Sequence, residues 1–257
     1  LVAFDDLEET LSEEENHLLE FVSQKFASGK RLNEVLMLEV LSSASESADV
    51  VDLWKRSMLA YGLPCGNYAV RNMISLMTGE YYDCGSARRR FRDCVLIEER
   101  CGAYRVSSMM ASALANPDFR SAMDDVLSFA RGRYEAYYKS CGGFVVGKKY
   151  TYEDVFRLLN WKKNEVALNV GGYKFDAETM TYPVFVNYDK SQEINDTIRY
   201  EDRFLDPSTL VAISKSKKNL RSPDVRTAAG SAYNGVKMYL FVRKNKDDKE
   251  SKEFYYL

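Results

Sequence analysis

The hydrophobic period of the chain changes near Gly142 and Gly143, and this change limits the folds that it can adopt. Before these glycines, apolar residues recur about every 3.6 positions, as they do between Leu18 and Phe26. After them, the spacing approaches two, as in residues 237–244. Because helices and strands have these two periods, we predict an α+β fold. A helical domain would cover residues 1–142, and a β-rich domain would cover residues 143–257.

The first domain has the pattern of a small helical bundle. Ser12 and Glu15 have the spacing of a capping box, which predicts a helix start, and Gly29 predicts the end of that helix. Two further helices are expected at about residues 32–41 and 48–61. The pattern of apolar and polar residues predicts that all three helices are amphipathic. We therefore expect each helix to bury one face in a shared core.

The segment from about residue 64 to 115 has the element order of a winged helix, which is two helices followed by a hairpin. A helix is expected at residues 68–77 and an arginine-rich helix at 86–93. A hairpin of two strand-like runs then follows, at residues 94–99 and 103–107. Another helix, at about residues 117–139, leads to the glycine pair.

The second helix of a winged helix enters the DNA major groove. In this chain that helix carries four basic side chains, Arg88, Arg89, Arg90 and Arg92. The sequence alone leaves two alternatives open. The arginines could lie on a solvated face or pair with Asp83 and Asp93, and the unit could dock a protein instead of DNA.

The second domain has the pattern of strands with one embedded helix. Thr151 and Asp154 have the spacing of a helix start, and the helix would end near Trp161. Strands are expected at residues 184–188, 209–214, 237–244 and 253–257. The charged residues 245–250 would join the last two strands. This combination suggests a small, strongly curved sheet or a partly open barrel.

Aromatic and basic residues interleave in these strand-like runs, for example in residues 171–175 and 237–244. Such a composition is typical of a surface that stacks bases and neutralises phosphates. The alternative is that the aromatic side chains form the core, with Phe185, Phe241 and Trp161 as the leading core candidates.

Composition excludes several classes of active site. The single histidine, His17, lies in an acidic amphipathic segment, whereas Ser-His-Asp, Cys-His and HExxH sites each need a suitably placed histidine. The five cysteines form no CxxC pair, and their spacing fits no common four-cysteine zinc site. No GxxxxGK[ST] loop occurs, so ATP is not bound in that way. We expect no catalytic residues, no metal site and no enzymatic activity in this chain.

The net charge of −2 hides an uneven distribution. Residues 1–60 hold 13 acidic and 5 basic residues, whereas residues 143–257 hold 16 and 20. Local basic patches therefore remain compatible with binding of nucleic acid.

The cysteines and the apolar runs bear on localisation. The odd number of cysteines without a CxxC pair favours a reducing compartment. The sequence shows neither a signal peptide nor an apolar run long enough for a membrane helix, so we expect a cytoplasmic protein without membrane contact. Because the chain begins with Leu1 and ends in a strand-like run, we expect a fragment of a longer protein.

Several short motifs, in a fixed order, carry a resemblance to a known domain. They are Lys149-Tyr150-Thr151-Tyr152-Glu153-Asp154-Val155, Leu158-Leu159-Asn160-Trp161, Gly171-Gly172-Tyr173, Pro183-Val184-Phe185-Val186, Tyr200-Glu201-Asp202-Arg203-Phe204, Ser214-Lys215-Ser216-Lys217, Leu240-Phe241-Val242-Arg243-Lys244 and Phe254-Tyr255-Tyr256-Leu257. The chain resembles a bacterial domain of unknown function that follows the helicase core in superfamily II DEAD/DEAH-type helicases. Those helicases often also carry an N-terminal phospholipase-D-like nuclease domain. Ala212-Ile213 stands where a tryptophan is expected.

The resemblance implies an accessory region of an ATP-dependent nucleic-acid helicase in a restriction or phage-defence system. Its partners would be DNA and the helicase and nuclease domains of the same polypeptide, while ATP and Mg²⁺ would belong to the absent helicase core. Small curved-sheet modules of restriction-type enzymes can read a flipped base in an aromatic pocket. Four aromatic residues are candidates for such a pocket, namely Trp161, Tyr173, Tyr188 and Tyr200. Four basic residues are candidates for phosphate contacts, namely Lys215, Lys217, Lys218 and Arg221.

Two other functions compete with DNA binding. The acidic N-terminal helices favour a protein-interaction module that docks the helicase and nuclease domains. A nuclease of the restriction-enzyme type would need an acidic residue and a [DE]-x-K pair on adjacent strands to hold Mg²⁺. The strand-like runs contain no such pair. Two [DE]-x-K sequences, Asp247-Asp248-Lys249 and Glu250-Ser251-Lys252, fall in the charged loop.

Overall fold

The computed structural model describes residues 10–140, 143–170, 172–187, 203–206, 209–211, 218–244 and 252–257. The chain forms two compact units. Unit 1 comprises Leu1–Gly143 together with Asn160–Asn164, and unit 2 comprises Phe144–Leu159 and Glu165–Leu257. We call Asn160–Asn164 the returning segment, because the chain leaves unit 1 after Gly143 and joins it again over these five residues.

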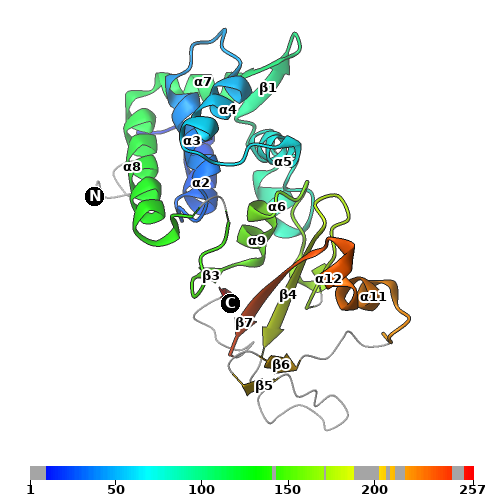
Figure 1. The fold of residues 1–257 in the computed structure, drawn as a ribbon. Helices are drawn as coiled ribbons and strands as arrows, with labels where there is room; N and C mark the ends of the chain where they lie inside the picture. Colours follow the sequence, from blue (N-terminus) through cyan, green and yellow to red (C-terminus); the bar gives the residue numbers. More distant parts are fainter. Residues whose placement is uncertain are drawn as a thin grey trace. The chain divides into compact units, whose positions relative to one another are not determined.

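The helices of unit 1 confirm the predicted helical pattern (Figure 1). They include α2 (Glu13–Phe26), α3 (Leu32–Ser43), α4 (Val50–Ala60) and α8 (Pro117–Arg133), which continues into the π-helix η1 (Tyr134–Tyr138). Helix α7 (Ser108–Ala115) was not predicted. The predicted capping box of α2 is present: the Ser12 hydroxyl accepts from the Glu15 amide, and Glu15 Oε2 accepts from the Ser12 amide at 2.7 Å. Its reciprocal bonds satisfy two amides that the helix itself leaves without partners.

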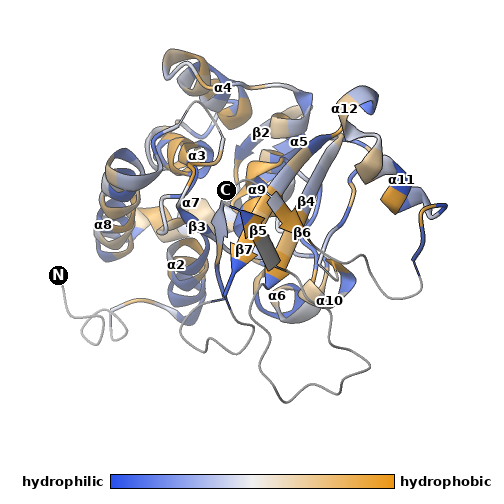
Figure 2. Ribbon diagram, turned by 60° about the horizontal axis from the view of Figure 1, so that its bottom comes forward, coloured by the Kyte–Doolittle hydropathy of each residue, from blue (hydrophilic) through white to orange (hydrophobic). Residues whose placement is uncertain are grey.

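Helix α3 differs from the amphipathic helix that was expected. Its residues from Leu32 to Leu38 are all buried, including Asn33 and Glu34. The helix packs against both α4 and α8, so it has no solvated face over most of its length. By contrast, α8 carries hydrophilic and hydrophobic segments along its length (Figure 2), as a helix with one exposed face should.

The predicted helix–helix–hairpin order is also present in unit 1. It comprises α5 (Asn67–Met77), α6 (Gly85–Phe91) and the antiparallel strands β1 (Ile97–Arg100) and β2 (Ala103–Val106). Gly79, at φ +75°, makes the turn after α5. A Cβ at this position would lie 2.3 Å from the carbonyl oxygen of Arg92, so the turn needs glycine both for its backbone angle and for its approach to the end of α6.

Unit 2 contains a four-stranded mixed sheet with the strand order β3-β8-β7-β4. The strands are β3 (Lys149–Tyr150), β4 (Thr181–Asn187), β7 (Lys237–Arg243) and β8 (Phe254–Tyr256), with β4 parallel to β7. A separate hairpin pairs β5 (Arg203–Asp206) with β6 (Thr209–Val211), and the helices are α9 (Tyr152–Leu158), α10 (Ala167–Val170), α11 (Pro223–Ala229) and α12 (Ser231–Asn234). The α+β class is confirmed, and the described strands form no closed barrel.

Aromatic side chains form the core of unit 2. Phe185 of β4 stacks on Phe241 of β7 with ring centroids 5.1 Å apart, and Phe254 of β8 contacts Phe185 edge-on. Tyr152 of α9 covers this group, with its ring centroid 4.2 Å from that of Phe185. Burial raises the pKa of the Tyr152 hydroxyl. The alternative that strand aromatics form core is therefore correct for Phe185 and Phe241.

A buried arginine joins three parts of unit 1. Arg31, just before α3, donates to Glu34 at 3.2 Å, to Asn72 of α5 at 2.6 Å and to Asn160 of the returning segment at 2.7 Å. The Arg31 and Glu34 side chains are only 6% and 2% exposed. A buried charge requires such partners, so this network fixes the returning segment against α5.

In the described part of the chain, no helix has both the length and the apolar character required to cross a bilayer.

Arg31→Leu should lower the free energy of unfolding of unit 1 by about 3–5 kcal/mol, because it removes the guanidinium from a buried carboxylate. Trp54 and Trp161 both belong to unit 1, so tryptophan emission during urea unfolding reports on this unit. The exposed Arg56 provides a matched control, and Arg56→Leu should change the free energy by less than about 0.5 kcal/mol. Equal unfolding midpoints for the two variants would contradict this role of Arg31.

Candidate nucleic-acid interface

Helix α6 carries three exposed arginines, a fourth, Arg92, caps its C-terminus, and the four have different surroundings. Arg90 pairs with Glu20 of α2, and Arg92 pairs with Asp83 at 3.4 Å. Within the described residues, neither Arg88 nor Arg89 forms an ion pair. The alternative of pairing with Asp83 is thus correct for Arg92, whereas Arg88 and Arg89 extend into solvent.

The returning segment adds two lysines beside this helix. The Asn164 amide donates to the Tyr81 carbonyl at 2.9 Å, and the Cys84 thiol, at the start of α6, donates to the Asn164 carbonyl at 3.2 Å. These bonds hold the exposed Lys162 and Lys163 near the base of α6. The sequence-based prediction missed both lysines, although an adjacent pair of lysines directly after a tryptophan was a visible signal.

Asp83 links the two groups of cations. Its two carboxylate oxygens lie 3.4 Å from Arg92 Nη1 and 3.6 Å from Lys163 Nζ. Arg88 and Arg92 are four residues apart, which places them on one side of the helix. We call this set the α6 basic cluster and define it as Arg88, Arg89, Arg92, Lys162 and Lys163. Among the described residues, Asp83 pairs with Arg92 and Lys163, whereas Arg88, Arg89 and Lys162 form no ion pair, so the surface is locally positive although the chain carries a net charge of −2.

Trp161 does not lie where a nucleotide base could reach it. The residue is 3% exposed and belongs to unit 1, and Asn72 of α5 donates to its carbonyl at 2.6 Å. The prediction of a base contact at Trp161 is therefore wrong. The aromatic ring is a core side chain, and it fixes the returning segment while Lys162 and Lys163 remain exposed.

Tyr173, in unit 2, is half-buried. Its ring stacks on that of Tyr182 at 5.6 Å between centroids, with an interplanar angle of 25°. Tyr182 is itself buried, its hydroxyl donates to the Asp224 carbonyl at 3.2 Å, and burial raises its pKa. One face of Tyr173 is therefore covered by the protein. The other two pocket candidates, Tyr188 and Tyr200, lie outside the described residues.

The second group of basic candidates is only partly described. Lys218 pairs with Asp224 at 3.2 Å. Burial acts to raise the Asp224 pKa, but the hydrogen bond and charge of Lys218 and the backbone amides of Asp224 and Val225 together lower it. Arg221 is exposed, and its amide donates to Asn219 Oδ1 in a local turn. Lys215, Lys217 and the charged residues 245–250 lie outside the described residues. The described part thus offers one exposed cation and one ion-paired cation.

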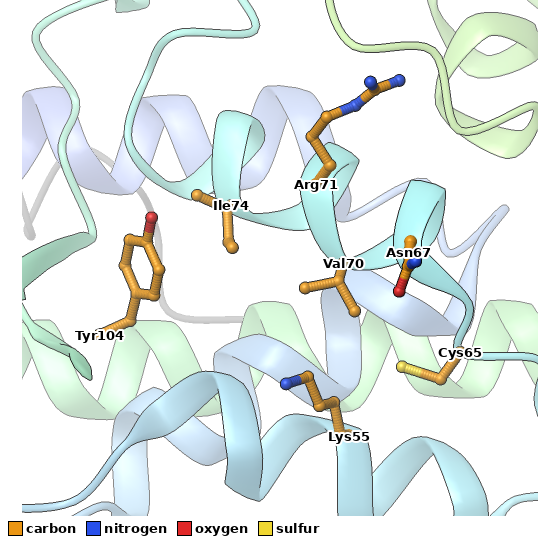
Figure 3. A pocket seen from close by; sticks show the side chains of 7 residues that line it. All are labelled: Lys55, Cys65, Asn67, Val70, Arg71, Ile74 and Tyr104. Carbon is orange, nitrogen blue, oxygen red and sulfur yellow. The ribbon is translucent and has the colours of Figure 1, made fainter. Parts of the chain in front are cut away.

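Unit 1 also has an open hollow of about 360 Å³ (Figure 3). It is lined by Lys55, Cys65, Asn67, Val70, Arg71, Ile74 and Tyr104. Figure 3 shows the Arg71 side chain extending away from Lys55, so the two cationic groups do not converge on one point. Because a phosphate is held by converging donors, this hollow is a weaker candidate than the α6 basic cluster.

Among the described residues, no group of cysteines lies close enough together to hold a metal ion. Cys65, Cys84, Cys94 and Cys101 are all thiols, and Cys141 lies outside the described residues. Burial, with smaller contributions from Asp93 and Glu20, raises the pKa of Cys94 to about 12. Cys101 is exposed in the turn between β1 and β2.

Two family models match the chain. Residues 1–139, more than half of its length, match "Domain of unknown function (DUF8090)". Residues 144–257 match "Domain of unknown function (DUF3427)". No curated protein matches the chain.

Trp161→Ala should lower the free energy of unfolding of unit 1 by about 3–5 kcal/mol, because it leaves a cavity in the core. Urea unfolding followed by the emission of Trp54 measures this change. Tyr173→Ala, in unit 2, serves as the comparison, since it should leave the unfolding of unit 1 unchanged. A Trp161→Ala protein of unchanged stability would show that the ring is not a core side chain.

Proposed function

We propose that this chain, which belongs to the DUF8090 family, is a nucleic-acid-binding accessory region of an ATP-dependent helicase. The observation that carries the DNA-binding part is the α6 basic cluster, in which two distant segments of unit 1 present exposed cations together. The helicase context rests on the resemblance of residues 144–257 to the domain that follows helicase cores. A role in restriction or phage defence belongs to the same proposal.

Phosphate contact suits the chemistry of the cluster. Arg88, Arg89 and Lys162 have long, exposed cationic side chains, and they are not engaged by carboxylates in the described structure. Each could neutralise one phosphate and release a counterion. The α6 basic cluster contains no aromatic residue, and the neighbouring Trp161 is buried, so its ring cannot stack on a base. The chain should therefore contact the sugar-phosphate backbone of duplex DNA, with little preference for the base sequence.

Binding by the isolated chain should be weak and strongly dependent on salt. The chain carries a net charge of −2, and Glu20 and Asp83 pair with three of the six cations of Arg88, Arg89, Arg90, Arg92, Lys162 and Lys163. Only a few phosphate contacts remain, and each contributes about 0.9 to the salt slope of binding. In the proposed setting, the helicase core would supply the remaining affinity.

A second function, protein docking, is supported by a different surface. Near the ends of α4 and α8, Tyr61, Phe129 and Tyr137 are exposed. Arg131 lies 5.2 Å from the Tyr61 ring, and Arg133 lies 5.8 Å from the Phe129 ring. Exposed aromatic and arginine side chains are enriched at protein interfaces. This surface would dock the helicase or nuclease domain of the same polypeptide.

Single alanine substitutions of Arg88, Arg89 and Lys162 should each lower the salt slope of DNA binding by about 0.9, because each removes one phosphate contact. Fluorescence anisotropy with a labelled duplex, repeated over a range of salt concentrations, gives this slope. Changes in DNA sequence should have little effect on any of the variants.

Arg56→Ala is the matched control, because Arg56 is an exposed arginine on α4, away from the α6 basic cluster. Its salt slope should equal that of the unmodified chain. Unchanged affinity after charge reversal of Arg88, Arg89 and Lys162 together would reject DNA binding at this cluster. Docking would then become the preferred function, and Phe129→Ala should weaken capture of the isolated helicase or nuclease domain.

A further inference from the structure

The single histidine of the chain lies beside a cysteine and an aspartate. His17 projects from α2, whereas Asp93 and Cys94 lie in the turn between α6 and β1. One potential ligand atom from each residue, an imidazole nitrogen, a carboxylate oxygen and Cys94 Sγ, falls within 4.8 Å of the other two. His17 Nε2 is 3.3 Å from Asp93 Oδ1. All three residues belong to unit 1.

The three groups match the ligands that zinc prefers. Zn²⁺ binds thiolate sulfur, imidazole nitrogen and carboxylate oxygen at about 2.0–2.3 Å, usually in tetrahedral geometry. Ligand atoms less than 5 Å apart can reach such an ion after small side-chain rotations. Cys94 is fully buried, while the side chains of His17 and Asp93 are 34% and 76% exposed, so an ion can enter from solvent.

The surroundings of His17 also suit a metal ligand. Its second ring nitrogen, Nδ1, faces Glu20 Oε2 at 3.9 Å. This distance is longer than a hydrogen bond, and a small rotation of Glu20 would let it accept the second N–H of a metal-bound histidine, as carboxylates commonly do. The other oxygen of Glu20 accepts from Arg90 and Gln24, which holds the carboxylate in place. Phe91 stacks on the imidazole ring at 6.1 Å and restricts its rotation.

We propose that His17, Asp93 and Cys94 bind a divalent metal ion of the zinc class. This differs from the sequence-based expectation that the chain has no metal site. Three protein ligands leave a fourth position for water. The ion would tie α2 to the turn that follows the arginine-bearing helix, so its role is to fix α6 within unit 1. The proposal does not depend on DNA binding.

Cobalt(II) provides a direct test, because it replaces zinc and reports on its ligands. Titration of the reduced chain with Co²⁺ should produce a thiolate-to-cobalt charge-transfer absorption that saturates at one ion per chain, and Zn²⁺ should abolish it. Cys94→Ser should remove this band. His17→Gln should weaken Co²⁺ binding by at least about tenfold, as expected for loss of a ligand. Cys101→Ser, which removes an exposed thiol elsewhere in unit 1, should leave the band unchanged.

Two further measurements exclude loss of folding as the cause of a missing absorption band. Far-UV circular dichroism should match among the variants, and Zn²⁺ should raise the melting temperature of the unmodified chain but not that of His17→Gln. His17 is partly exposed, so this substitution keeps the core intact. Absence of a thiolate band, or a band that survives both His17→Gln and Cys94→Ser, would overturn the proposal.

Discussion

The buried guanidinium of Arg31 determines how unit 1 is completed. Its hydrogen bonds to Glu34, Asn72 and Asn160 join α3, α5 and the returning segment. A charge in this position is stable only when all of these partners are in place, so the network allows one position of the segment and disfavours others. Together with the bonds of Asn164 to Tyr81 and Cys84 and the buried ring of Trp161, this network places Lys162 and Lys163 beside α6.

Local features of the sequence predicted most of the elements. The capping boxes at Ser12 and Thr151 mark real helix starts, because each depends only on residues three positions apart. The strands around Val184 and Phe241 follow their apolar pattern. Helix α3 was misread as amphipathic. Its near-continuous apolar run is typical of a helix that is buried on all sides. The packing of α4 and α8 against it confirms this burial.

Contacts between distant residues explain what the sequence could not show. Arg31 and Asn160 are 129 positions apart, and His17 and Asp93 are 76 apart. No spacing rule connects such residues, so the returning segment and the His17–Asp93–Cys94 group emerge only in the fold. The arginines of α6 were visible as a local run. Trp161 was a candidate both for a base pocket and for the core, because an aromatic residue beside basic ones has the same composition in a core as on a binding surface, and its burial decides for the core.

Unit 1 thus combines a buried polar network with an exposed cationic surface that depends on it. The most direct test of this arrangement is hydrogen–deuterium exchange of the chain with and without duplex DNA, at low salt. If the α6 basic cluster contacts DNA, amides of Gly85–Phe91 and of Asn160–Asn164 should gain protection together, while those of α8 should not change. Protection confined to unit 2, with both of these segments unaffected, would contradict the assignment.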